Sequence, residues 1–110
     1  GLLHGKINRY YTMEEIDRRC LRRQIVYLID EMEKLEKILT YLISKDILTE
    51  FNRQEILAKE ILRVKIMTFI SILITRGPNA FSHFIEALNE TGQSHIVDKL
   101  KNEKAKLRNE

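Results

Sequence analysis

Residues 74–88 read ITRGPNAFSHFIEAL, and they predict a corner between two helices. Gly77 can adopt the left-handed backbone that ends a helix without a Cβ clash. Pro78 suits the first turn of the next helix, where its missing N–H leaves no hydrogen bond unmade. An apolar stripe at helical spacing follows, typical of a buried helix face. It comprises Phe81, Phe84, Ile85 and Leu88.

The composition indicates one helical domain. A chain of 110 residues fits a single domain and can bury a core without disulfides. One proline and four glycines interrupt it, so we expect long helices joined by short turns. The apolar fraction of 44% and the charged fraction of 32% are typical of helices with one buried and one solvated face. The net charge of +3 is low for a protein that binds nucleic acid.

Apolar periodicity predicts six helices. The first follows Thr12 and Glu15, which have the spacing of a capping box, and it ends near Glu33. No glycine or proline separates it from the second helix, so one long helix is also compatible with the sequence. Thr49 is expected to be the N-cap of the third helix. The helices after the first are expected at 35–45, 50–59, 61–75, 78–90 and from 94 to about 100.

Six amphipathic helices with short connections predict an all-α fold, a six-helix antiparallel bundle around one core. The bundle is expected over residues 13–100, and Phe51 and Leu62 are among the residues expected to face its core. Residues 1–12 show no clear periodicity and are interpreted as a flexible N-terminal arm. Residues 101–110 are polar on nearly every face, and they are interpreted as a C-terminal tail, either a frayed helix end or a linker.

No arrangement of residues predicts a catalytic site, a metal site or a cofactor. Cys20 lies among arginines without the local signature of a nucleophilic cysteine, so a structural thiol is favoured. His4, His83 and His95 lack the spacing of metal ligands. Because Cys20 is the only cysteine, no internal disulfide can form, and we expect a reducing compartment, the cytoplasm. No apolar run is long enough to span a membrane.

A cluster of arginines on the first helix is the strongest charge signal, and it comprises Arg18, Arg19, Arg22 and Arg23. Such a cluster can bind the phosphates of nucleic acid, but Glu14, Glu15 and Asp17 in the same turns would repel them. No aromatic platform for bases accompanies the cluster. Arginine binds carboxylates in a planar, bidentate way, so an acidic protein partner is the better interpretation. Charge alone leaves a merely solvated surface as the alternative.

Three blocks of the chain resemble the caspase recruitment domains (CARDs) of the death-fold superfamily. Residues 13–23, MEEIDRRCLRR, are similar to the opening of initiator-caspase CARDs. Residues 42–49, LISKDILT, resemble the exit of the second helix in caspase and adaptor CARDs. The corner, extended over residues 75–100, is the most specific block. The resemblance covers nearly all of residues 13–100 and implies a death-fold bundle, often with a bent first helix, that binds other CARDs.

The resemblance also implies a common binding mode, in which a basic surface on the first and fourth helices meets an acidic surface on the second and third. The basic candidates are Arg18, Arg19, Arg22, Arg23, Arg63 and Lys65. The acidic candidates are Asp30, Glu31, Glu33, Glu36, Asp46 and Glu50. Initiator-caspase CARDs that use this mode tend to carry further arginines where this chain has Ile25 and Met67.

The expected function is homotypic CARD–CARD binding that recruits or oligomerises an initiator caspase in apoptotic signalling. The segment itself is not expected to be an enzyme, and a protease domain would lie outside it. The expected partner is another CARD-containing protein, namely an apoptosome-type scaffold, an adaptor or a caspase, with self-association as a further option. Neither nucleic acid nor membrane is expected as a partner. The alternatives are the CARD of an adaptor that recruits a caspase and, less favoured, a helical domain that binds nucleic acid.

Overall fold

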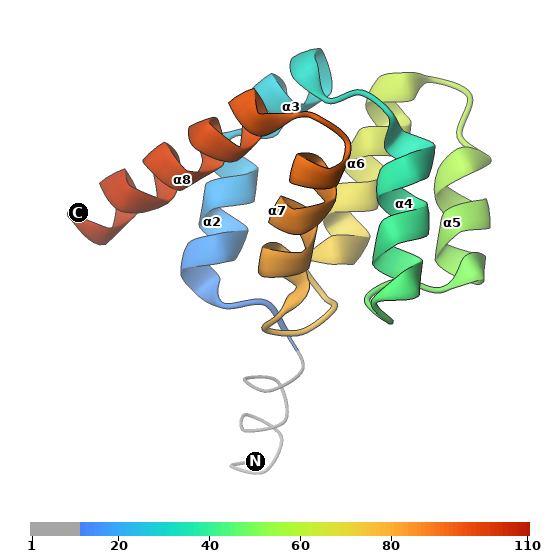
Figure 1. Ribbon diagram of the computed structural model, residues 1–110, viewed down its shortest axis with the longest axis horizontal. Helices are drawn as coiled ribbons and strands as arrows, with labels where there is room; N and C mark the ends of the chain where they lie inside the picture. Colours follow the sequence, from blue (N-terminus) through green and yellow to red (C-terminus); the bar gives the residue numbers. More distant parts are fainter. Residues whose placement is uncertain (1–11) are drawn as a thin grey trace, which may run out of the picture.

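The computed structural model describes residues 12–110, and these contain helices and no strands (Figure 1). The predicted all-α fold is therefore confirmed. The predicted N-terminal arm lies, apart from Thr12, outside the described residues. In chain order the helices are α2 (Glu15–Arg23), α3 (Ile25–Glu31), α4 (Leu35–Ser44), α5 (Glu50–Leu57), α6 (Leu62–Leu73), α7 (Ala80–Glu90) and α8 (Ser94–Arg108).

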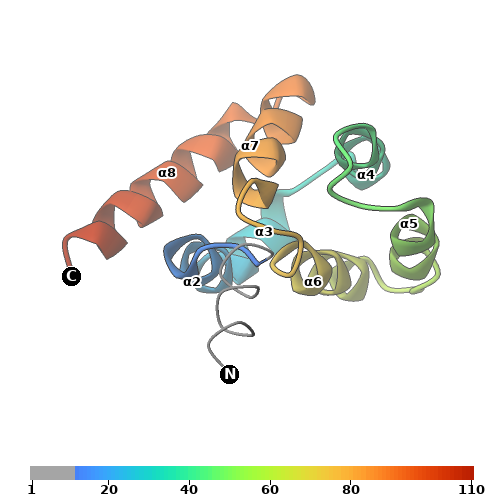
Figure 2. The same ribbon diagram turned by 90° about the horizontal axis from the view of Figure 1, so that it is seen from below.

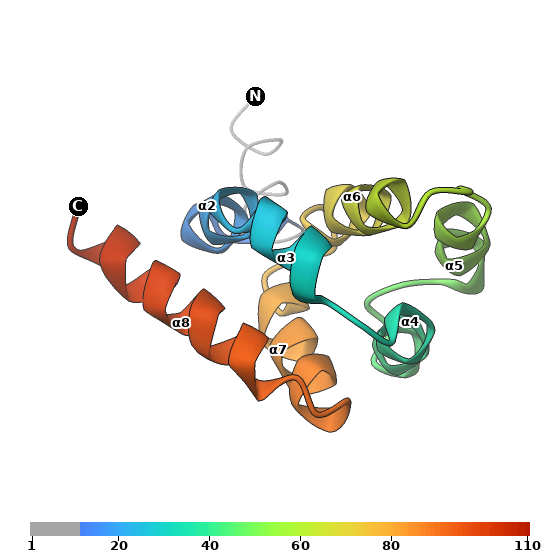
Figure 3. The ribbon, with the colours of Figure 1, turned by 90° about the horizontal axis from the view of Figure 1, so that it is seen from above.

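The helices close a ring around one core. Helix α2 packs on α8, α8 on α7, α7 on α4, α4 on α5, α5 on α6 and α6 on α3. Figures 2 and 3 show the ring as two layers, with α2, α3, α6 and α5 in one and α8, α7 and α4 in the other. The first and last described helices, α2 and α8, therefore lie side by side although they are far apart in the sequence.

The centre of the core is an aromatic pair between the two layers. The rings of Phe69 on α6 and Phe84 on α7 meet edge to face, with centroids 5.5 Å apart and an interplanar angle of 73°. Both side chains are fully buried. Each of the other helices adds at least one residue with no exposed surface, and these are Leu21, Leu28, Leu39, Ile56 and Leu100. The apolar periodicity thus identified at least one fully buried core residue on every helix.

The corner between α6 and α7 has the predicted glycine geometry but a different role for proline. Gly77 has a φ of 98°, in the region that favours glycine. The Ala80 N–H donates to the Gly77 carbonyl oxygen over 3.3 Å, so Pro78 lies inside a tight turn. Helix α7 begins only at Ala80, with Asn79 as its N-cap. Proline suits the second position of such a turn because its φ is preset.

The prediction of one continuous first helix ending near Glu33 is wrong, because the helix breaks at Gln24. Helix α2 packs on α8 whereas α3 packs on α6, and a straight helix could not follow both. The Gln24 side chain donates from Nε2 to Glu103 Oε1 over 2.7 Å, which ties the break to α8. The start also differs, since α2 begins at Glu15 with Glu14 as N-cap and no side-chain cap from it. The bend implied by the family resemblance is present.

The prediction that the last helix dissolves near Leu100 is also wrong. Helix α8 continues to Arg108, and Leu107 near its end is only 5% exposed. Some polar residues of this segment have partners on α2, among them Lys104, whose Nζ lies 2.7 Å from Asp17 Oδ1. Tertiary contacts with α2 therefore extend the helix through a segment that has little periodicity of its own. The division of the chain into an arm, a domain and a tail otherwise stays a prediction.

The predicted cap of the third helix of the bundle is confirmed. Thr49 Oγ1 accepts a hydrogen bond from the Asn52 N–H over 3.1 Å, and the Thr49 N–H donates to Asn52 Oδ1 over 2.9 Å. This reciprocal pair satisfies two backbone N–H groups at the start of α5 that would otherwise lack partners.

Removing the buried ring of Phe84 should strongly destabilise the domain. We expect Phe84→Ala to lower the free energy of unfolding by roughly 3–5 kcal/mol, because the ring is fully buried and its loss leaves a cavity against Phe69. Phe51→Ala is the matched control, since its ring is 74% exposed and its removal should change stability by less than about 0.5 kcal/mol. Denaturant titration measures both, and equal losses would contradict this account of the core.

A β-branched residue at the corner should strain it. We expect Gly77→Val to destabilise the domain by roughly 1–3 kcal/mol, because valine is poorly accommodated at positive φ. The control is Arg76→Val at the neighbouring exposed position, which does not have a positive φ. Thermal melts followed by circular dichroism compare the two variants. A Gly77→Val protein that melts with the wild type would show that the corner does not need glycine.

Candidate protein-interaction surfaces

The four predicted arginines of α2 do not form one free surface. Arg19 and Arg23, four residues apart and hence on one face of the helix, both contact Glu110 beyond the end of α8. The distances to the Glu110 carboxylate are 3.2 Å from Arg19 and 3.5 Å from Arg23. These are exposed ion pairs that contribute little to stability, but they occupy both guanidinium groups.

The other two arginines of α2 differ from this pair and from each other. Arg22 is exposed and makes no hydrogen bond or ion pair with any described residue. Arg18 is half-buried beside a hollow of about 440 Å³ at the start of α2, and its Nε is buried without a hydrogen-bond partner. Arg22 is therefore the arginine of α2 that is most available to a partner protein.

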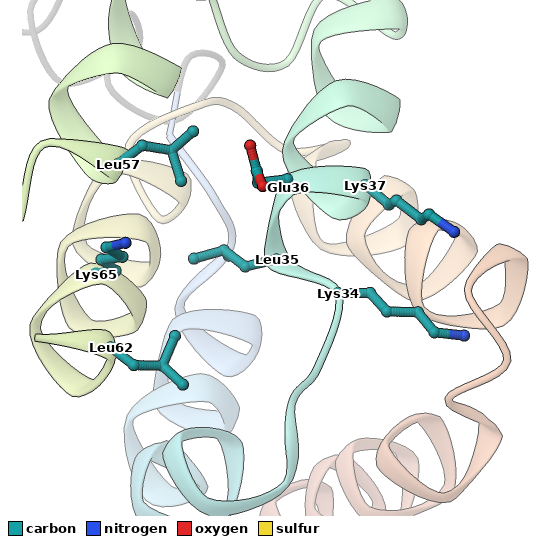
Figure 4. A pocket seen from close by; sticks show the side chains of 7 residues that line it. All are labelled: Lys34, Leu35, Glu36, Lys37, Leu57, Leu62 and Lys65. Carbon is teal, nitrogen blue, oxygen red and sulfur yellow. The ribbon is translucent and has the colours of Figure 1, made fainter.

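The two basic residues predicted for the binding surface on α6 differ in exposure. Arg63 is exposed and forms no ion pair among residues 12–110. Lys65 is half-buried in a groove of about 470 Å³ between α4, α5 and α6. Figure 4 shows Leu35, Leu57, Leu62 and Lys65 lining this groove, while the side chains of Lys34 and Lys37 point away from them.

The predicted acidic candidates do not form one surface either. Asp30 and Glu31 lie on α3 and Glu33 follows it, so they belong to the elements near the basic helix. Glu36 on α4 and Glu50 on α5 are brought together by Arg53, which lies 3.4 Å from the first carboxylate and 3.5 Å from the second. The sixth candidate, Asp46, lies in the connection between α4 and α5 with a φ of 60°. The α4–α5 surface is thus acidic but partly neutralised by Arg53.

Sequence reasoning missed Arg53 and misplaced several apolar side chains. Phe51 is 74% exposed and Leu62 is 56% exposed, although both were predicted to face the core. Met67 is 49% exposed and lies four residues after Arg63 on α6, so the two side chains share one face. Val26 on α3 is also exposed. These residues have helical apolar spacing, and only the arrangement of neighbouring helices shows that nothing covers them.

The sulfur of Cys20 is placed as expected for a structural thiol. The residue has no exposed surface, and its Sγ–H donates to the Leu100 carbonyl oxygen over 3.2 Å. Burial, with smaller contributions from the carboxylates of Glu103 and Asp17, raises the pKa of the thiol from 9.0 to about 11. A cysteine nucleophile needs the opposite shift and access to solvent.

Two of the three histidines considered as metal ligands make contacts on the surface. The third, His4, lies outside the described residues. His83 Nδ1 lies 3.0 Å from Glu86 Oε2 on α7, and Tyr41 of α4 donates to the same oxygen over 2.9 Å. These two hydrogen bonds, that of His83 first, lower the pKa of the Glu86 carboxyl. His95 lies 3.9 Å from Glu31. Residues 12–110 contain no group of three or more His, Cys, Asp or Glu side chains that could hold a metal ion.

The comparison with known proteins agrees with this all-helical fold. A family model for the caspase recruitment domain matches residues 18–103. The chain belongs to the CARD family. It is 34% identical over 96 residues to caspase-2 of Gallus gallus, an alignment that covers 87% of this chain and 22% of that protein. The chain therefore spans about a fifth of the length of this curated relative.

Membership of the family gives the general function. A CARD is a non-catalytic domain that binds other CARDs, so this chain is a protein-interaction module of caspase and apoptotic signalling. None of the helices in residues 12–110 has the length and apolar character needed to cross a bilayer. The exposed charged surfaces described above are the candidate interaction surfaces of this CARD.

The thiol of Cys20 should be unreactive in the folded CARD. Because the pKa of about 11 lies above the ordinary value of 9.0, the folded state holds the proton more tightly. The stabilisation linked to this proton is present below about pH 9 and is lost as the pH rises through 11. At about pH 8 a thiol-reactive chromophore should label the unfolded chain and leave the native CARD almost unlabelled. Equal labelling rates would show an accessible thiol.

Proposed function

We propose that this CARD recruits or oligomerises an initiator caspase by binding another CARD through a basic surface around Arg22 and Arg63. The observation that carries the proposal is the availability of these two side chains. Both are exposed and neither has a partner among residues 12–110, in contrast to Arg19 and Arg23. Arginine forms bidentate hydrogen bonds with carboxylates, which suits an acidic surface on the second and third helices of another CARD.

The location of the two arginines supports a shared surface. Arg22 lies at the end of α2 next to α3, and Arg63 lies at the start of α6, on which α3 packs. Figures 2 and 3 both place α2, α3 and α6 in the same layer of the molecule. The exposed apolar side chains Val26 and Met67 are on these same helices, so the proposed contact combines charge with apolar burial.

The acidic surface of this chain favours a different protein over self-association. Arg53 lies within 3.5 Å of both Glu36 and Glu50, so part of the negative charge on α4 and α5 is already balanced. A partner CARD with uncompensated carboxylates on the corresponding helices would complement Arg22 and Arg63 better. We propose an apoptosome-type scaffold, an adaptor or another caspase as this partner.

The proposed parent protein is a caspase that works in the cytoplasm. The similarity to caspase-2 over 87% of this chain supports such a parent over an adaptor. Its protease domain would lie outside the segment described here. CARD binding would then act by proximity, since tethering weakly associating domains raises their local concentration to roughly the millimolar range without any new contact. Reducing conditions suit the single, buried and unpaired cysteine.

The charge reversal Arg22→Glu with Arg63→Glu tests this function. We expect it to weaken binding to a partner CARD by several kcal/mol, because like charges would meet across the interface. Helicity and melting temperature should barely change, since exposed charges contribute less than about 1 kcal/mol to folding. Calorimetry against a panel of purified CARDs from scaffolds, adaptors and caspases measures the effect.

The matched control is the double reversal Arg76→Glu with Lys106→Glu, at exposed positions outside the proposed surface. It changes the net charge equally and should leave binding intact. Restoring complementarity by placing basic residues on the acidic face of the partner should recover the affinity of the Arg22 and Arg63 variant. If that variant binds every partner as well as the wild type, the basic surface is only solvated and the proposal fails.

A further inference from the structure

A groove between α7 and α8 lies apart from Arg22 and Arg63. Its volume is about 430 Å³, and its lining residues are Phe81, Ser82, Ile85, Lys101, Lys104 and Arg108. Phe81 is only 5% exposed, so its ring forms a recessed apolar floor, and Ile85 lies half-buried one helical turn further along α7. None of the lining residues is acidic.

The cations of this groove fall into two kinds. Lys104 is balanced by Asp17 at 2.7 Å, and its Nζ lies 4.7 Å from the centroid of the Phe81 ring. Lys101 and Arg108 are exposed and have no hydrogen-bond or ion-pair partner in the described part of the chain. Seven residues make nearly two helical turns, so these two side chains leave α8 on the same side, about 10 Å apart along its axis.

We propose that this groove binds an acidic segment of a protein partner. An apolar side chain of the segment would pack on Phe81 and Ile85, and carboxylates on either side of it would pair with Lys101 and Arg108. The argument is charge complementarity around an apolar floor, since two unbalanced cations flank a concave surface that lacks any lining carboxylate. A spacing of about 10 Å matches acidic residues seven apart on a helix, whose side chains leave the helix on the same side.

The shape of the groove favours such a segment over a lipid surface or nucleic acid. A bilayer binds apolar side chains that protrude, whereas Phe81 is recessed and can be reached only by a side chain that enters the groove. The affinity of a protein for nucleic acid rises with the number of phosphates that its cations neutralise. This groove offers only two unpaired cations, too few for tight binding. Phosphates would also leave the apolar floor uncovered.

A short peptide with one leucine flanked by glutamates tests the proposal on the whole chain. Heteronuclear NMR should show shift changes confined to the amides of α7 and α8, and fluorescence anisotropy gives the affinity. The reversal Lys101→Glu with Arg108→Glu should weaken binding at least about tenfold. The double reversal Arg76→Glu with Lys106→Glu is the matched control, because it changes the net charge equally at exposed positions that do not line the groove, and it should have no effect.

Further variants distinguish the apolar contribution to peptide binding from the electrostatic contribution. Ile85→Ala should weaken the peptide severalfold, and a peptide with serine in place of leucine should bind more weakly than the parent peptide. If the double reversal unfolds the domain, the milder pair Lys101→Gln with Arg108→Gln replaces it. The proposal is overturned if the peptide does not bind, if its shifts lie elsewhere, or if the serine peptide binds equally. It is also overturned if vesicles of anionic phospholipid or a single-stranded oligonucleotide bind this groove as tightly as the leucine peptide.

Discussion

The closed ring of helices in this CARD depends on the break at Gln24 in its first helix, and the hydrogen bond from Gln24 to Glu103 ties this break to α8. The first piece packs along α8 and the second along α6. An unbroken helix over residues 15–31 would be a rod about 25 Å long that could follow only one of these neighbours. Glu103 is only 9% exposed, so its carboxylate needs the donor that Gln24 provides.

The contact between α2 and α8 contains buried charged residues, and it decides which charges remain for partners. Asp17 pairs with Lys104 inside it, and Cys20 donates to a backbone oxygen of α8. At its edge, Arg19 and Arg23 meet Glu110. These contacts use charged groups that would otherwise be free to bind another CARD. Arg22 on α2 remains available because it is exposed and pairs with no carboxylate of residues 12–110.

A second set of polar contacts joins the α3–α4 connection to the α7–α8 connection, which lies far from it in the sequence. The buried amide of Gln93 accepts from the Glu33 N–H over 2.7 Å and donates to the Glu33 carbonyl oxygen over 2.9 Å. Lys34 follows with a φ of 57° and donates from Nζ to the Thr91 carbonyl oxygen over 3.0 Å. The link between α3 and α4 is therefore held against the corner between α7 and α8. This sets where α4 begins and accounts for the side chain of Lys34 pointing away from the groove in Figure 4.

Local chemistry in the sequence was enough to determine the helical class, central core residues on each helix, the cap at Thr49 and the left-handed glycine at Gly77. These features depend on residues within a few positions of one another, so periodicity and backbone preference report them directly. The break at Gln24, the extension of α8 to Arg108 and the exposure of Phe51 and Leu62 depend on which helices become neighbours. The same is true of the candidate site, where Glu110 engages Arg19 and Arg23 but leaves Arg22 free. Only the tertiary structure could decide these features, because each depends on which residues, tens of positions apart in the sequence, come into contact.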